Sequence, residues 1–180
     1  MSHPHRVWLG LGANLGDAHA TLRATVDRFV DDDRFSGILA SSAWRGPYVG
    51  PLAPQPDYVN LCMVARTALG PTEVLAVARG LEREAGRAAD TNELPRVLDI
   101  DVLLFDTLVL EGPELVLPHP RMRRRRFVLE PLAELEPGLA LPPDGVTVAA
   151  LLRAPEVAGQ ELELVAAECG HDEGVSGGQR

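Results

Sequence analysis

A central β-strand is predicted by Arg96-Val97-Leu98-Asp99-Ile100-Asp101-Val102-Leu103-Leu104-Phe105, a run rich in Val, Leu and Ile. After its first residue, only two aspartates interrupt the apolar character of this strand. Because side chains alternate along a strand, Asp99 and Asp101 lie on one face, with Cα atoms about 6 to 7 Å apart. Burying two carboxylates is costly, so a positive group is expected to face them.

Three further strands are predicted before this one. The alternation of Val7, Leu9 and Leu11 indicates the first strand. A weaker pattern indicates the second strand, and a similar alternation indicates the third. These strands cover residues 6–11, 35–44 and 57–69. A long loop is expected over 46–56, because four prolines and two glycines in it do not suit regular structure.

Two helices are predicted between these strands. The first follows Asp17, a suitable N-cap, and the second begins around Pro71 and ends at Gly86, a suitable C-cap. Their apolar positions recur at helical spacing, at Leu22, Val26, Phe29 and Val30 and then at Val74, Ala78, Leu81 and Ala85. Each helix therefore has one apolar face to bury against a sheet.

The order strand, helix, strand, strand, helix, strand predicts an α+β fold with a ferredoxin-like βαββαβ core, in which helices cover one face of a mostly antiparallel sheet. A C-terminal hairpin is expected at 108–117, a helix at 124–135 and a short helix at 146–152. Residues 1–165 are expected to form a single domain, and residues 166–180 a flexible tail.

Composition excludes several classes of protein. The chain has 180 residues, a 46% hydrophobic fraction and a net charge of −9, which together favour one acidic globular domain over a general nucleic-acid binder. All 17 basic residues are arginine, which excludes a Walker A loop. Because no apolar run approaches the roughly 20 residues of a membrane span and no signal peptide is evident, we expect a cytoplasmic protein with no membrane partner.

The aspartate pair is a candidate magnesium site, because magnesium takes oxygen ligands and usually binds together with nucleotide phosphates. The alternative is a structural network of ion pairs with arginine. Arg96 and the arginine-rich run 121–126 supply planar donors for phosphate oxygens, although a solvated helix face would explain most of that run equally well. His119 lies between prolines and has either a phosphate-binding or a structural role.

Tyr58 and Asn60 share a face of their predicted strand and could bind a planar heterocycle, since one offers a flat ring and the other an amide that donates and accepts. The alternative is an ordinary strand edge. Gly10-Leu11-Gly12 is only weakly similar to a dinucleotide-binding fingerprint, because the third glycine, Gly16, comes one place late.

Four segments together resemble the 6-hydroxymethyl-7,8-dihydropterin pyrophosphokinase family, and the similarity covers roughly residues 7–152. They are Gly12-Ala13-Asn14-Leu15-Gly16, Gln55-Pro56-Asp57-Tyr58-Val59-Asn60, Pro95-Arg96-Val97-Leu98-Asp99-Ile100-Asp101, and Leu117-Pro118-His119-Pro120-Arg121-Met122 followed by Arg125 and Phe127. Each motif is modest alone, but their order along the chain is specific.

The resemblance implies an enzyme of folate biosynthesis, which transfers pyrophosphate from ATP to the hydroxymethyl group of the dihydropterin and releases AMP. It implies two Mg²⁺ ions held by Asp99 and Asp101, which with Arg96 and Arg125 would be the catalytic residues. The implied ATP-binding residues are Glu82, Arg87, Arg96, Ile100, His119 and Arg125. The implied pterin-binding residues are Gly46, Pro47, Val49, Tyr58, Asn60 and Phe127.

We expect the pyrophosphokinase to be a monomer. Two other functions remain open on the sequence. One is a ferredoxin-like module that binds a nucleotide or pterin without turnover. The other is a nucleic-acid binder acting through residues 121–126, which the net charge and the lack of interleaved aromatic residues disfavour.

Overall fold

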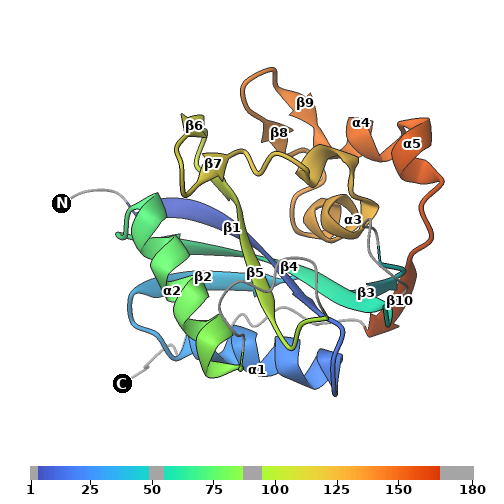
Figure 1. Cartoon of the computed structure of the whole chain (residues 1–180). Coiled ribbons are helices and arrows are strands. Elements are labelled where there is room, and N and C mark those ends of the chain that lie inside the picture. Colours follow the sequence, from blue (N-terminus) through green and yellow to red (C-terminus); the bar gives the residue numbers. More distant parts are fainter. Residues whose placement is uncertain (1–3, 49–54, 87–94, 167–180) are drawn as a thin grey trace, which may run out of the picture.

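A six-stranded antiparallel sheet lies at the centre of the protein (Figure 1). The structure is a computed structural model and describes residues 4–48, 55–86 and 95–166. Within these ranges, the strands of the sheet are β1 (His5–Ala13), β2 (Phe35–Ala40), β3 (Ala43–Gly46), β4 (Tyr58–Thr67), β5 (Asp99–Phe105) and β10 (Glu163–Ala166). They lie in the order β10-β3-β4-β1-β5, and β2 also pairs with β4. The predicted first, third and fourth strands are confirmed as β1, β4 and β5.

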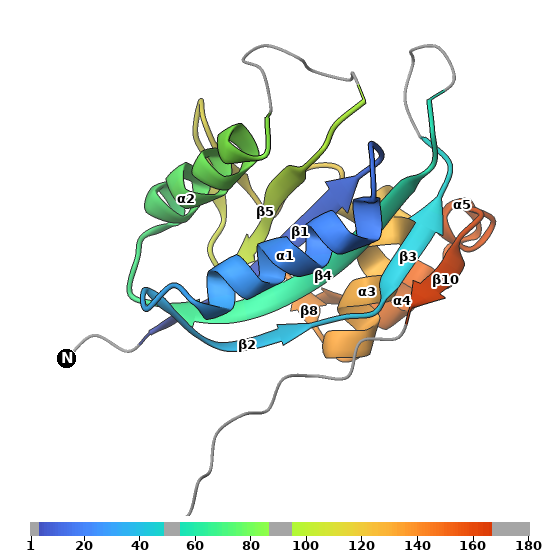
Figure 2. The same cartoon turned by 90° about the horizontal axis from the view of Figure 1, so that it is seen from below.

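Two helices cover one face of this sheet, as the periodicity predicts. They are α1 (Ala18–Val30) and α2 (Pro71–Glu84) (Figure 2). The Asp17 side chain caps α1 by accepting a hydrogen bond from the Ala20 N–H at 3.0 Å. Leu22 and Phe29 of α1 are fully buried in the same cluster as Leu9 of β1. Burial of this apolar stripe fixes the helix on the sheet.

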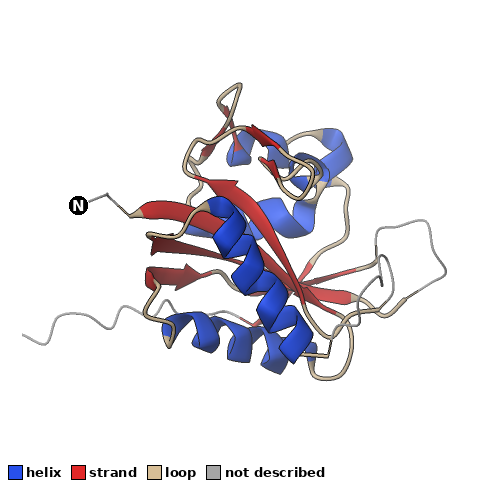
Figure 3. Ribbon diagram, turned by 60° about the vertical axis from the view of Figure 1, so that its left-hand side comes forward, coloured by secondary structure: helices blue, strands red, loops and turns tan. Residues whose placement is uncertain are grey.

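The opposite face is covered as well, by C-terminal helices whose position the sequence did not predict. Helix α3 (Arg126–Leu135) and α4 (Val148–Leu152) lie there (Figures 2 and 3). The second buried cluster joins Leu129 and Leu132 of α3 to Trp8 of β1 and Leu103 of β5. Because β1, β4 and β5 are apolar on both sides, a sheet covered on one face would leave these side chains in water.

The predicted strand over 35–44 is broken into β2 and β3, and β3 extends to Gly46. Gly37 has φ +58°, and the register with β4 shifts between Ser36 and Leu39. At the break, the Ser41 hydroxyl accepts the Cys62 N–H at 3.0 Å, and the Ser42 N–H donates to a Glu134 carboxylate oxygen on α3 at 2.8 Å. Side chains thus replace part of the backbone ladder.

The C-terminal part is more elaborate than the sequence predicts. The hairpin over 108–117 is confirmed as β6 (Leu110–Glu111) and β7 (Val116–Leu117). The helix over 124–135 is observed as a 3₁₀ turn, η1 (Met122–Arg124), followed by α3. The unpredicted elements are β8 (Ala140–Leu141), β9 (Val146–Thr147), α5 (Pro155–Ala158) and β10. Residues 146 and 147, expected to be helical, belong to β9, so the helix in this segment is only α4.

Ala166 ends β10, and the rest of the predicted tail, 167–180, lies outside the described residues. In the described ranges, the longest helices are too short and too polar to cross a bilayer.

Helix α2 offers a test of its local stability. Gly80 lies inside this helix, and a Cβ added there would find its nearest neighbour, Arg83 Nη2, at 4.0 Å. We expect Gly80→Ala to stabilise the protein by about 0.5 to 1 kcal/mol, because alanine loses less backbone entropy on helix formation. Urea denaturation measures this as a higher midpoint at constant slope, and a lower midpoint would contradict it.

Candidate active site

The two aspartates of β5 face a cavity at the centre of the molecule. Asp99 and Asp101 are partly exposed, with 27% and 40% of their side-chain surfaces accessible, while Ile100 between them is buried. Arg96 forms an ion pair with Asp99 through Nη1 and Oδ1. Arg96 therefore lies beside the carboxylate pair, as its position just before the strand predicts.

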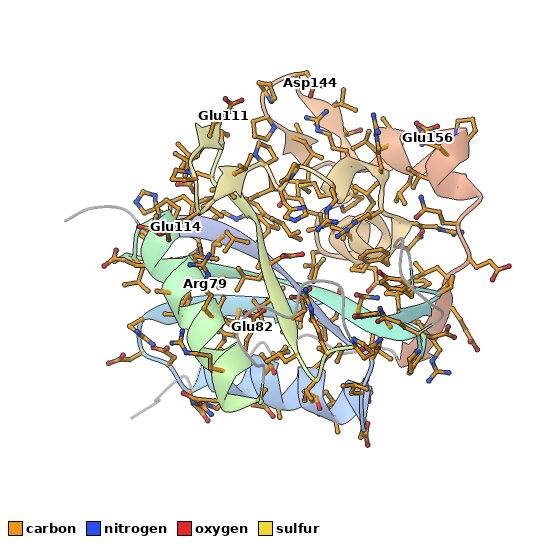
Figure 4. The ribbon with its side chains drawn as sticks, in the orientation of Figure 1. Arg79, Glu82, Glu111, Glu114, Asp144 and Glu156 are labelled. Carbon is orange, nitrogen blue, oxygen red and sulfur yellow. The ribbon has the colours of Figure 1, made fainter. Side chains whose placement is uncertain are left out.

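Glu82 stabilises the backbone between the two aspartates. Its side chain on α2 is 4% exposed, and Oε1 accepts the Ile100 N–H at 2.8 Å. A buried carboxylate requires such a donor, since burial of an unpaired charge is unfavourable. Glu82 lies on the cavity wall, and it links helix α2 to the strand that carries the aspartates (Figure 4).

His119 approaches the second aspartate from the other side. Its N–H donates to the Leu103 carbonyl oxygen at 2.9 Å, which fixes the histidine beside β5. Nδ1 accepts the Arg121 N–H at 3.3 Å, so a neutral ring carries its hydrogen on Nε2, 3.7 Å from Asp101 Oδ2. The imidazole thus presents a donor toward the carboxylate.

The electrostatics of this region are set by burial and by crowding of like charges. Loss of solvent raises the pKa of Asp101 above its usual value, and the charge of Asp99 raises it further. Burial lowers the pKa of His119, although the charge of Asp101 opposes this, so the ring favours its neutral form. Burial and the nearby charge of Arg121 lower the pKa of Arg125. Carboxylates and guanidinium groups therefore face one another across the cavity.

Aromatic rings and one amide form another part of the wall. Tyr48 and Tyr58 stack with ring centroids 6.2 Å apart, and Arg125 lies over the Phe127 ring at 5.3 Å. Burial raises the pKa of the Tyr58 hydroxyl. Asn60 is 8% exposed, yet within the described part of the chain no residue hydrogen-bonds its amide. A buried amide of this kind is suited to a ligand with matching donors and acceptors.

Gly12 makes room for this amide. It pairs with Asn60 across β1 and β4, and a Cβ at position 12 would lie 2.9 Å from Asn60 Oδ1. A side chain at position 12 would push this amide aside, so the glycine keeps the amide in its observed position.

We expect Gly12→Ala to displace the Asn60 amide and to raise the KM for the ligand it binds by about tenfold, because small misplacements in a site are costly. Steady-state kinetics with the substrates proposed below measure this. Gly138→Ala is the control, since a Cβ there meets no atom within 4 Å. Equal KM values for the two variants would contradict the role of Gly12.

These residues surround one cavity of about 470 Å³. Of the residues predicted from the sequence, it is lined by Pro47, Tyr58, Asn60, Glu82, Arg96, Asp99, Ile100, Asp101, His119, Arg125 and Phe127. Gly46 ends β3 outside this wall, where a Cβ would lie 3.2 Å from the Glu161 carbonyl oxygen. Val49 and Arg87 lie outside the described residues.

At the far wall of the cavity, α2 meets the β6–β7 hairpin. Arg79 and Glu114 point toward one another there, with Nη1 3.4 Å from Oε2 (Figure 4). Both side chains are largely exposed, so this pair contributes little to stability. It does mark one rim of the cavity.

Sequence reasoning missed three residues of the site. Asn14 connects the segment before β5 to the segment before β4. Its Oδ1 accepts the Arg96 N–H at 2.7 Å, and its Nδ2 donates to the Pro56 carbonyl oxygen at 3.2 Å. Tyr48 lines the cavity, and its hydroxyl is buried without a hydrogen-bond partner in the described ranges. Arg121 also lines the cavity. Asn14 had a signal as the polar residue between the glycines after the first strand, and Arg121 had one as a member of the arginine-rich run, but Tyr48 had none.

A carboxylate pair on one strand, faced by arginine and histidine in a shared cavity, defines a site typical of enzymes that transfer phosphate groups with the help of a metal ion. Comparison with known proteins narrows this class. Residues 8–137 match the family described as 7,8-dihydro-6-hydroxymethylpterin-pyrophosphokinase (HPPK). The chain belongs to this family.

Curated relatives carry the name of the same family. A 2-amino-4-hydroxy-6-hydroxymethyldihydropteridine pyrophosphokinase of Pseudomonas aeruginosa is 38% identical over 149 residues, which cover 83% of this chain and 91% of that protein. The protein of the same name from Synechocystis sp. is 35% identical over 148 residues, which cover 82% of this chain and 75% of that protein.

Solved structures share the fold at low sequence identity. An HPPK-DHPS crystallised with substrates superposes with a TM-score of 0.64 at 10% identity, over 83% of this chain and 43% of that one. Wild-type HPPK-DHPS of Plasmodium falciparum superposes with a TM-score of 0.61 at 14% identity, over 82% of this chain and 40% of that one. The present chain thus spans less than half the length of these proteins.

Proposed function

We propose that this cavity transfers pyrophosphate from ATP to the hydroxymethyl oxygen of 6-hydroxymethyl-7,8-dihydropterin and releases AMP, a step of folate biosynthesis. Family membership supports this ATP-dependent pyrophosphokinase activity. The observation that carries the proposal is that one cavity combines the Asp99 and Asp101 carboxylates with the buried Asn60 amide. A phosphate-binding centre and a heterocycle site would therefore be adjacent.

We infer a ferredoxin-like βαββαβ core and a single domain over residues 1–165. The strand order β5-β1-β4-β3, with α1 and α2 on one face, supports the core. The second cluster, which packs α3 against the same sheet, supports one domain. The cytoplasmic location and the monomeric state remain predictions from the sequence.

The donor set fits magnesium bound together with ATP. Across residues 4–48, 55–86 and 95–166, no group of three or more His, Cys, Asp or Glu side chains is arranged to hold a metal ion. Magnesium commonly takes one or two protein carboxylates and completes its shell with phosphate oxygens and water. Asp99 and Asp101 would hold two Mg²⁺ ions, which neutralise charge on the phosphate chain when bound.

The arginines and the histidine of the site would position the phosphate chain. Arg96 and Arg125 present planar donors, which suit phosphate oxygens, and His119 presents the Nε2 hydrogen. Glu82 would act through Ile100 by holding the strand, in addition to lying near the nucleotide. Arg87, which the family resemblance also places near the nucleotide, and Val49 near the pterin are kept as predictions.

The pterin would stack between Tyr58 and Phe127 and hydrogen-bond to Asn60, with Pro47 and the adjoining Gly46 backbone at its edge. This places the hydroxymethyl group beside the phosphate chain. Positioning and charge neutralisation would supply most of the catalysis, since an alcohol held in line with the β-phosphorus needs little further assistance.

A magnesium-dependent assay for AMP tests this function. AMP is expected only when ATP, Mg²⁺ and hydroxymethyldihydropterin are all present, and it should continue over many turnovers. Binding of ATP or pterin without AMP formation would contradict the proposal and favour a binding module. Retention of the chain on DNA above about 0.2 M salt would instead favour a nucleic-acid binder.

A further inference from the structure

The arginine-rich run 121–126 is divided between two tasks. Arg123 donates to both carboxylate oxygens of Asp144, at 2.8 and 2.7 Å, and to the Pro142 carbonyl oxygen at 2.8 Å. Arg126 donates to Glu130 at 3.0 Å and to the Gln160 carbonyl oxygen at 2.9 Å. These two guanidinium groups therefore connect the C-terminal layer and are not available to a ligand.

Arg121 and Arg125 line the cavity, whereas Arg123 and Arg126 do not. They flank the 3₁₀ turn η1, Arg121 as its N-cap and Arg125 as its C-cap, and both line the cavity. Met122 within the turn is fully buried, and the contacts of Arg123 fix its other side. A turn held at two points in this way presents the two flanking arginines to the same space.

The two arginines share the cavity wall with the carboxylates of Asp99 and Asp101. Even so, within the described residues neither guanidinium group forms an ion pair with a carboxylate. The two positive charges repel one another, and an anion bound between or beside them would relieve this repulsion. ATP carries such charge on its phosphate chain.

We propose that Arg121 is a second phosphate-binding arginine, which together with Arg125 holds the phosphate chain of ATP opposite Asp101. This assignment rests on the function proposed above. Two guanidinium forks at the ends of one turn can bind neighbouring phosphate groups, whereas one arginine can bind only part of the chain. Arg121 thus adds a contact to those that the family resemblance assigns to ATP.

Arg124 provides a matched control. It lies in the same turn, carries the same charge and is exposed like Arg121, but it is not part of the cavity wall. Removing its charge changes the net charge of the protein as much as removing that of Arg121. A difference between the two variants therefore reports the location of the charge.

The test compares the wild-type chain with Arg121→Gln, Arg121→Lys and Arg124→Gln. The probe is the Mg²⁺ complex of α,β-methylene ATP, which cannot be cleaved between its α- and β-phosphates, and calorimetry gives its dissociation constant. Arg121→Gln is expected to weaken binding by about 10- to 100-fold, and Arg124→Gln by less than about twofold. Arg121→Lys is expected to be intermediate, because it keeps the charge but not the fork.

Two further readouts separate binding from a structural role. The dissociation constant of hydroxymethyldihydropterin alone and the unfolding temperature should not change in Arg121→Gln, while KM for ATP rises. Equal analogue binding by Arg121→Gln and Arg124→Gln would overturn the assignment. Weaker analogue binding by Arg121→Gln, in a chain whose wild type forms no AMP, would support the assignment and overturn the proposed function instead.

Discussion

Asp101→Asn is expected to lower the rate of AMP formation by about 10³-fold, which corresponds to about 4 kcal/mol of transition-state stabilisation. The amide has the shape of the carboxylate but lacks the charge that magnesium requires. Because loss of solvent and the charge of Asp99 raise the pKa of Asp101, its ionised form is disfavoured in the folded protein. Stability should therefore stay constant or increase while activity is lost.

This combination distinguishes a metal ligand from a structural ion pair. A member of a structural network would lose stability when neutralised, with little direct effect on turnover. Glu111→Gln is the control for a change of charge, since Glu111 is exposed on the β6–β7 hairpin outside the cavity wall (Figure 4). Turnover of Asp101→Asn within a few-fold of the wild type would refute the metal assignment.

Asn60→Ala is expected to lower kcat/KM for the dihydropterin by about 100-fold or more, because a site built to hydrogen-bond its substrate discriminates strongly through that contact. Binding of α,β-methylene ATP should be unchanged. Since the Asn60 side-chain amide has no hydrogen-bond partner in the described part of the protein, its removal breaks no protein hydrogen bond, and the free energy of unfolding should change little compared with the loss of activity.

Asn60→Asp refines this test. The carboxylate keeps the size and the acceptors of the amide but loses its N–H donors. If the pterin requires both a hydrogen-bond donor and an acceptor at this position, Asn60→Asp should be nearly as impaired as Asn60→Ala. A variant that binds the pterin normally, by fluorescence or calorimetry, would exclude Asn60 from the pterin site.

Much of the fold follows from local patterns. The alternation in β1 and β4 and the helical stripes of α1 and α2 are set by neighbours within a few residues, and they were predictable for that reason. The break between β2 and β3 depends on Glu134, about 90 residues away, which no local pattern reveals. The C-terminal layer was underestimated because its strands are only two residues long.

The candidate site was also predictable only in part. Spacing alone placed Asp99 and Asp101 on one face, and the cavity brings them together with Arg96, His119 and Arg125. Sequence could not separate the arginines of the run 121–126, because their directions depend on the 3₁₀ turn and on distant partners such as Asp144. The hydrogen bonds of Asn14 likewise join segments that are far apart in sequence.

Helix α3 limits how far this protein can be shortened. The first five strands and two helices end with β5 at Phe105, and a minimal version trimmed to that point would still contain both aspartates. It would lack Arg125 and Phe127, which stand at the start of α3 on the cavity wall, and Leu129, which anchors the same helix. The smallest fragment that can carry the whole site must therefore continue through the second layer of the molecule.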